Sequence, residues 1–451
     1  MGAELTLDRR VGWVAHPPHY EELHALLKDG GAGRLLKLTT ARYVPWEEFR
    51  ALPTPRRMGA ETAWSLLKLV LRASGIEIPI PDLEGNEYWY HRTHEIADSV
   101  ARIQCLCRAD SDLYRRLTAT QNRSVLVRSR IDETMAAALL DGLEIDEPNG
   151  KLLLRLDRAP RDDTERLIRN TLTALDDLQS LVDVPFSKEL FWHLRYLLLE
   201  GVDVRSIKFT APRLGLIAVD YESQDVARAA DAQLSYISAY MNHVAGDVHD
   251  HAVLRALLVP DLFRYYRPLP DVNSEVGRLA FRLYALKVGL PVLGMLPLSR
   301  IKLKWEERLF DSSIVTLQPD IYFPARERDG TDLTAHSTLS LQIALVALQD
   351  LNWELHKLEQ RDAELRSLLQ RDPEINHRQR SVLGRALRNP LAEFRIAYHK
   401  NTHNVVYATA RADLLELVDK GLLVLGKQGR AMVFTPRPGL REHIEQHYGR
   451  D

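Results

Sequence analysis

The sequence contains little cysteine and no long apolar run. Its two cysteines, Cys105 and Cys107, are too few for a disulfide framework or a Cys-rich zinc site, so we expect two buried thiols near a helix. No stretch approaches 18 consecutive apolar residues, which excludes a membrane-spanning helix. The polar start MGAELTLDRR lacks the apolar core of a secretion signal. We therefore expect a cytoplasmic protein with no membrane partner.

The chain also lacks a charge excess of either sign. Its 60 Lys and Arg residues stand against 62 Asp and Glu among 451 residues. This balance excludes a nucleic-acid or membrane binder that uses its whole surface, so any DNA contact must be local. A local excess does occur at residues 374–451, which carry 13 Lys and Arg against 8 Asp and Glu.

Periodicity along the chain predicts a mostly α-helical protein of several domains. Residues 1–95 mix Pro and Gly breaks with short periodic pieces, and residues 96–338 show helical spacing of apolar side chains. Residues 339–373 repeat leucine at intervals of three and four, which is typical of one long amphipathic helix. At 212–221, an alternating run between breakers predicts a small β hairpin or flap.

The C-terminal residues 374–451 predict a winged helix-turn-helix. Helices are expected at 377–388, 391–398 and 407–420, followed by a hairpin whose tip is GKQG. The third helix would then be the recognition helix on double-stranded DNA. The side chains predicted to contact DNA are Arg378, Arg380, Arg411, Lys427 and Arg430. The alternative is a solvated basic face on a module that only stabilises the fold.

One loop between two predicted helices carries a recognisable motif. The segment RPLPDVNSEVGR at 267–278 resembles the Fic motif HPFxDGNGRxxR, with matches at Pro268, Asp271, Asn273 and Arg278. The flanking helices, an N-terminal YVPWEEF segment and the C-terminal domain are also similar to Fic proteins, so the resemblance covers about residues 40–445. It implies a Fic fold, and in that family the activity is transfer of AMP from ATP to protein hydroxyl groups.

The motif departs from the Fic pattern at the positions that carry the chemistry. Arg267 replaces the His that acts as general base, and a guanidinium stays protonated at neutral pH. Val272 and Ser274 replace the glycines of the phosphate cradle, which we expect to be damaged because a β-branched residue disfavours positive φ. Glu275 replaces a phosphate-binding Arg and is expected to repel ATP.

The retained charged residues have structural as well as functional interpretations. Asp271 matches the family's Mg²⁺ ligand, but it could instead cap the next helix, while Arg278 pairs with a nearby acid. The segment AALLDG at 137–142 resembles the family's inhibitory helix, with Asp141 in place of its Glu, followed by Gly142. Because Glu275 replaces the Arg that this acid would hold, we expect Asp141 to have no cation partner.

No cofactor is expected, although residual Mg²⁺ or nucleotide binding stays open. The sequence also contains three weak metal candidates, His243, His249 and His251. They are weak because an ordinary polar loop before a helix contains the same residue types. The sequence favours a degenerate Fic-fold protein that does not transfer AMP and acts as a DNA-binding regulator or scaffold. The alternatives are an enzyme of altered transfer chemistry or ligand binding, and a protein-interaction module with a partner at the flap. A homodimer is also compatible with the sequence.

Overall fold

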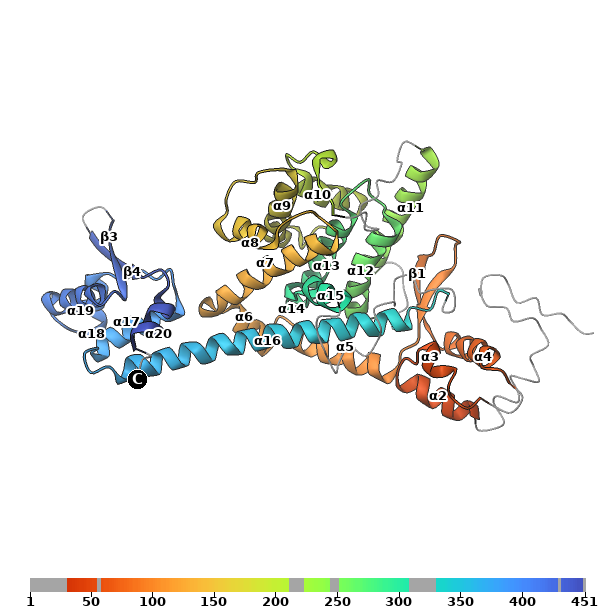
Figure 1. Ribbon diagram of the computed structural model, residues 1–451, viewed down its shortest axis with the longest axis horizontal. Helices are drawn as coiled ribbons and strands as arrows, with labels where there is room; N and C mark the ends of the chain where they lie inside the picture. The colour runs from red at the N-terminus through yellow and green to blue at the C-terminus, as the bar shows by residue number, and fades with distance from the viewer. Residues whose placement is uncertain are drawn as a thin grey trace, which may run out of the picture. The chain divides into compact units, whose positions relative to one another are not determined.

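A computed structural model describes residues 31–54, 58–210, 223–243, 251–307, 330–428 and 431–448 (Figure 1). The described residues are mostly helical, as predicted, with two small antiparallel sheets of two strands each. None of the described helices has both the length and the apolarity needed to cross a membrane. The predicted flap at 212–221 lies outside the described residues.

The chain divides into two compact units. Unit 1 comprises Met1–Tyr114 with Ser129–Gln349, and unit 2 comprises Arg115–Arg128 with Asp350–Asp451. Three helices contribute residues to both units, namely α6 (Asp112–Thr118), α7 (Arg123–Leu140) and the long α16 (Thr334–Arg371). The helix predicted at 339–373 corresponds to α16, which begins five residues earlier, at Thr334.

Unit 1 is a helical domain with one β hairpin near its N-terminal end. Its other elements are α2 (Gly31–Ala41), α3 (Trp46–Phe49), α4 (Ala60–Ala73), β1 (Ile76–Pro81), β2 (Glu87–Tyr90), α5 (His94–Cys107), α8 (Glu147–Leu156), α9 (Asp163–Asp177), η2 (Leu178–Leu181), α10 (Lys188–Leu199), η3 (Val204–Ser206), α11 (Gln224–Met241), α12 (Ala252–Tyr266), α13 (Asn273–Lys287), α14 (Pro291–Met295) and α15 (Leu298–Glu306). Strand β1 contains Pro79 and Pro81, which favour an extended backbone in the residues before them. Of the two cysteines, Cys107 is buried as expected, but Cys105 is exposed on α5.

Helices α12 and α13 form the centre of unit 1 and carry the 267–278 motif between them. Ten residues of α12 and twelve of α13 are buried. The two helices approach closely at Gly277, where an added Cβ would lie 2.9 Å from the Cβ of Phe263 and 3.0 Å from the Cα of Pro260. Because the first distance is shorter than carbon atoms tolerate and the second is tight, a side chain at this crossing would force its neighbours to shift.

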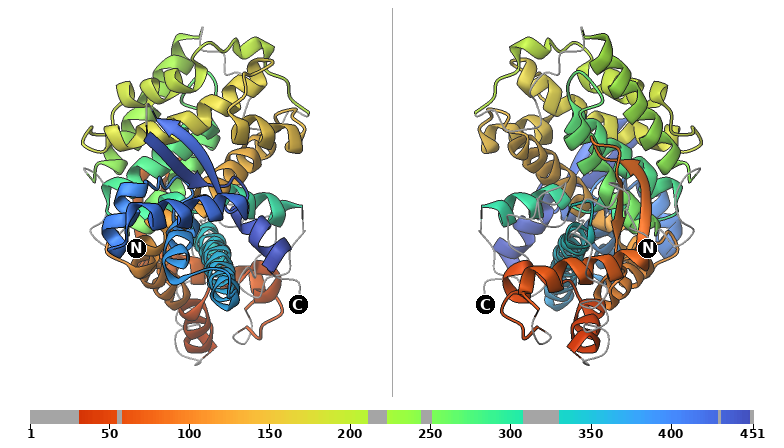
Figure 2. Two further views of the ribbon diagram at one scale, coloured as in Figure 1. Left: turned by 90° about the vertical axis from the view of Figure 1, so that its left-hand side faces the viewer. Right: turned by 90° about the vertical axis from the view of Figure 1, so that its right-hand side faces the viewer.

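Unit 2 has its own apolar core. Its hairpin of two strands is the dark blue pair of arrows in Figure 2. Its elements besides the shared helices are η1 (Thr120–Asn122), α17 (His377–Arg388), α18 (Ile396–His403), α19 (Tyr407–Asp419), β3 (Leu423–Gln428), β4 (Ala431–Pro436) and α20 (Leu440–Tyr448). The core joins Leu383 and Leu387 of α17, Leu414 and Leu417 of α19, and Phe434 of β4. Burial of these side chains fixes α17, α19 and the hairpin on one another.

Two predictions about the C-terminal residues were wrong. The helix predicted at 391–398 begins instead at Ile396, because Phe394 forms a β bridge with Phe434, with N–O distances of 2.8 and 2.9 Å in the two directions. The GKQG tip is also misplaced, since Gly426 and Lys427 lie within β3, paired with Val433 and Met432 of β4. The added α20 was not predicted.

The boundary of the helical core also differs from the prediction. Residues 115–128, assigned to the core by their helical spacing, group with the C-terminal unit. A side-chain contact explains this grouping, because Arg116 donates two hydrogen bonds to the Glu359 carboxylate, at 3.2 and 2.7 Å. Asn122 donates a third to the same carboxylate, at 3.2 Å.

Candidate functional site

The loop between α12 and α13 is held in a sharply turned conformation. Arg267 ends α12 with φ of 48° and Val272 precedes α13 with φ of 46°, both in the left-handed region. The side chain of Asn273 fixes the turn, because its Oδ1 accepts from the N–H of Leu269 at 2.9 Å. Its Nδ2 donates to the carbonyl of the same residue at 2.7 Å. The amide of Asn273 is therefore used to close the loop.

Val272 adopts the backbone conformation that glycine would favour. It does so although a β-branched side chain disfavours positive φ. A left-handed conformation costs about 1–2 kcal/mol for a residue with a Cβ. Full burial of the Val272 side chain stabilises the folded state by about 1.5–3 kcal/mol, which offsets that cost.

Asp271 is held by a guanidinium from another helix. Arg195 of α10 donates from Nε to Oδ1 at 2.6 Å and from Nη2 to Oδ2 at 2.7 Å, and both side chains are largely buried. The interpretation of Asp271 as a helix cap is wrong, because the N-cap of α13 is Val272 and makes no side-chain cap bond. This arrangement does not fit a Mg²⁺ ligand either, since both carboxylate oxygens already face the Arg195 fork.

Asp141 pairs with Arg278, the last basic residue of the motif. The guanidinium donates to both carboxylate oxygens, with Nη1 to Oδ1 at 3.2 Å. The prediction that Asp141 has no cation partner is therefore wrong, and the prediction that Arg278 pairs with a nearby acid is confirmed. The adjoining Gly142 has φ of 79°, which lets the chain turn away directly after α7.

Glu275 is a buried carboxyl beside this ion pair. Burial and the nearby Asp141 carboxylate together raise its pKa to about 8, against the opposing effect of Arg278. Neither Glu275 oxygen has a side-chain donor within hydrogen-bond distance, whereas the protonated form can donate to Asp141. The raised pKa favours the uncharged carboxyl, which weakens the expected charge repulsion of ATP.

A cavity of about 90 Å³ lies beside the motif and is lined in part by Ser274, Arg278 and Asp141. Four basic side chains line it, and each one contacts a carboxylate of this chain. These pairs are Arg264 with Asp261 at 3.1 Å, Lys302 with Asp261 at 3.5 Å, Arg282 with Glu133 at 3.2 Å, and Arg278 with Asp141. The positive charges that line the cavity are therefore balanced by carboxylates of the same chain.

Glu133 of α7 also occupies the start of α15. Its Oε1 accepts from the N–H of Ser299 and its Oε2 from the N–H of Arg300, both at 3.1 Å. Free N–H groups at a helix start are a common anion site, and here a carboxylate of the chain itself takes that position. An incoming phosphate would have to displace it.

The histidine candidates have separate local roles. Nε2 of His243 lies 2.7 Å from the hydroxyl of Tyr284, and Nδ1 of His251 accepts from the N–H of Val253 at 3.2 Å as the cap of α12. His249 lies outside the described residues. Among the residues that the structure describes, no group of three or more His, Cys, Asp or Glu side chains is arranged to hold a metal ion.

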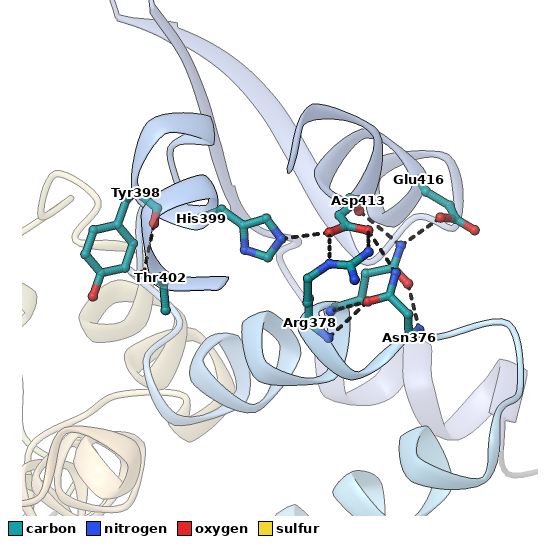
Figure 3. A network of polar contacts seen from close by, with 8 residues as sticks. Asn376, Arg378, Tyr398, His399, Thr402, Asp413 and Glu416 are labelled. Atoms are coloured by element: carbon teal, nitrogen blue, oxygen red, sulfur yellow. Dashed lines mark hydrogen bonds and ion pairs between the residues drawn. The ribbon is translucent and has the colours of Figure 1, made fainter. Parts of the chain in front are cut away.

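Two of the five residues predicted to contact DNA make hydrogen bonds within unit 2. Arg378 donates to Asp413 of α19, from Nε at 2.7 Å and from Nη2 at 2.9 Å (Figure 3). Arg380 donates to the carbonyl of Leu369 at 3.3 Å and of Asp372 at 2.8 Å, near the end of α16. Their guanidinium groups are engaged within the fold.

The remaining predicted contacts are better placed for a polyanion. Arg411 on α19 and Lys427 on β3 are exposed. Arg430 lies outside the described residues. Arg385 and Arg388, which the sequence places on the same predicted helix as Arg378 and Arg380, are also exposed. The structure adds two further exposed basic residues, Arg395 and Lys400.

Asp413 is the centre of the network in Figure 3. Its carboxylate accepts from Asn376 at 2.8 Å and lies 3.1 Å from Nε2 of His399, in addition to Arg378. Burial opposes its ionisation, but the hydrogen bonds from Arg378, Asn376 and His399 outweigh burial and lower its pKa to about 2. The ionised Asp413 thus ties α19 to α17 and α18.

No protein-family model and no curated protein matches the chain. Among solved structures, it is similar to a Fic family protein from Desulfovibrio desulfuricans over 76% of this chain and 96% of that one, at 16% identity and a TM-score of 0.43. A second similar structure is a Fic domain containing signaling protein from Bacteroides thetaiotaomicron, with 59% and 97% coverage, 13% identity and a TM-score of 0.38. Both are Fic proteins, the family that residues 267–278 resemble. At TM-scores below 0.5, neither likeness decides the function of this chain.

Proposed function

We propose that this chain is a Fic-fold protein that has lost AMP transfer and acts as a DNA-binding regulator or scaffold through a C-terminal winged helix. The observation that supports the loss of AMP transfer is the cavity beside the motif. Each of its four basic side chains contacts a carboxylate of the same chain: Arg264, Arg278, Arg282 and Lys302. A triphosphate needs free cations or N–H groups to offset its charge. Binding it here would require the chain to break several of its own ion pairs.

The motif also lacks a base for the transfer step. Arg267 stands where the family has His, and a protonated guanidinium cannot accept the proton of a target hydroxyl. Asp271 and Asn273 are occupied by Arg195 and by the Leu269 backbone. These contacts also weigh against an enzyme of altered chemistry that would use the same two side chains.

The order of elements in unit 2 supports the DNA-binding half. Three helices, α17, α18 and α19, precede the β3–β4 hairpin, and Phe394 forms an isolated β bridge with Phe434 of β4. In a winged helix, the third helix enters the major groove and the hairpin contacts the adjacent backbone. Residues 374–451 carry a net charge of +5, which suits this partner.

A DNA-binding titration of the full chain tests this function. We expect retardation of genomic duplex fragments at low salt, with affinity falling as salt rises. Lys427→Ala should weaken binding to all sequences and lower the salt slope by about one. The matched control is Arg155→Ala, an exposed basic residue on α8 of unit 1, which should leave binding unchanged. Absence of binding to any duplex at low salt would remove the regulator function and favour a protein-interaction module.

A further inference from the structure

The outward face of α19 has an unusual composition for a DNA-reading helix. Ala410, Asp413, Leu414 and Leu417 are buried against unit 2. The exposed positions in the first two turns are Tyr407, Ala408, Arg411 and Ala412. Because residues four apart lie on one face, Ala408 and Ala412 form a small apolar strip beside Arg411.

This face offers few ways to recognise a base. Residues 407–412 contain no Asn or Gln, which would read adenine, and no Asp or Glu, which would read cytosine. Their one charged donor, Arg411, matches the O6 and N7 acceptors of guanine. The small apolar strip matches the C5-methyl group of thymine, which is the apolar feature of the major groove.

The next exposed acidic residue on the helix, Glu416, is directed elsewhere. Glu416 accepts a hydrogen bond from Nε2 of Gln379 at 2.8 Å, so its carboxylate is held toward α17 (Figure 3). The same network fixes Asp413 to Arg378 and to His399. The outward face of α19 is thereby held in one orientation by its buried side, which is what discrimination between bases requires.

We propose, on the basis of the DNA-binding function proposed above, that α19 reads a short thymine-rich duplex site that contains one G·C pair. Arg411 is the residue that specifies guanine, through a bidentate contact to O6 and N7. Ala408 and Ala412 specify thymine by packing against its methyl groups. Lys427 contributes affinity without sequence preference because it lies on the hairpin.

Selection of binding sites from random duplexes by the full chain, followed by base-analogue substitution, tests this inference. Replacing a selected thymine with uracil removes only the methyl group, and we expect about a fourfold loss of affinity at each contacted position. Replacing the selected guanine with 7-deazaguanine removes the N7 acceptor, with an expected loss of about tenfold. In Arg411→Ala the 7-deazaguanine effect should vanish while the uracil effects persist.

The controls separate this inference from the function on which it rests. Lys427→Ala should lower affinity but keep the preference for both thymine and guanine. Binding that is insensitive to uracil and to 7-deazaguanine would overturn the base assignment and leave DNA binding in place. No binding to any duplex would overturn the DNA-binding function itself. Since Arg411 is exposed, its variant should fold normally, which circular dichroism checks.

Discussion

Glu275→Gln probes the neutral, buried carboxyl at the centre of the motif. In the folded chain the pKa of Glu275 is raised to about 8 from its ordinary 4.5, chiefly by burial. Between these pH values, the folded chain keeps a proton that the unfolded chain has lost. The contribution of Glu275 to the free energy of unfolding should therefore be fully present below about pH 4.5 and should decrease as pH rises toward 8.

The size of this effect follows from the two pKa values. At 1.36 kcal/mol per pH unit, the fall between pH 4.5 and 8 is on the order of 5 kcal/mol. Gln at this position stays neutral and can donate to Asp141 as the protonated carboxyl does. The variant should match the wild type near pH 5 and exceed it by several kcal/mol near pH 9.

Urea unfolding of both proteins at pH 5, 7 and 9, followed by tryptophan fluorescence, measures this difference. The exposed Glu144→Gln controls for the loss of a carboxylate as such and should shift the midpoint little at any pH. A stability difference that is constant with pH would refute the assignment of a neutral Glu275. So would a variant less stable than the wild type at pH 9.

Three further predictions concern contacts that lie within one or the other unit. Arg195→Ala should destabilise the chain by about 3 kcal/mol in thermal unfolding, because it leaves the largely buried Asp271 carboxylate unpaired, and adding Asp271→Asn should restore part of the loss. Asp413→Asn should cost about 2 kcal/mol at pH 7 but little near pH 2. Its lowered pKa means that the stabilisation exists above the ordinary 3.8 and is lost as pH falls toward 2, and an equal cost at both pH values would contradict this. Gly277→Ala should cost about 1–3 kcal/mol in urea unfolding, whereas Gly384→Ala on α17, where a Cβ meets open space, should cost nothing or stabilise.

Local signals in the sequence were sufficient for several elements. The helix predicted at 377–388 matches α17, since Pro373 breaks the chain before it and Asn376 forms a capping box with Gln379. The turned loop at 267–272 follows from its prolines and from its resemblance to the Fic motif. These features depend on residues close in sequence, which is why patterns along the chain reveal them.

The contacts that decide the chemistry of the site lie far apart in sequence. Arg195 is 76 residues from Asp271, and Asp141 is 137 residues from Arg278. Their pairing depends on how α10, α7 and α13 pack against one another, and patterns of neighbouring residues in the sequence do not predict this packing. The neutral state of Glu275 has the same origin, because burial raises its pKa and burial is a property of the fold.

The register of unit 2 shows a similar limit. The sequence predicts a helix over 391–398, but a β bridge between Phe394 and Phe434, 40 residues away, keeps Phe394 out of it. The sequence groups Arg378 and Arg380 with the other basic residues of this segment by charge. Their contacts with Asp413 and with the end of α16 depend on packing, which charge along the sequence does not reveal.

Incubation of the full chain with Mg²⁺ and ATP labelled at the α-phosphate tests the central claim most directly. The internally paired cavity and the missing base predict no labelled AMP on the chain and no rise in its melting temperature at millimolar ATP. Labelled AMP that appears on the chain, and disappears with Asp271→Ala, would contradict the account.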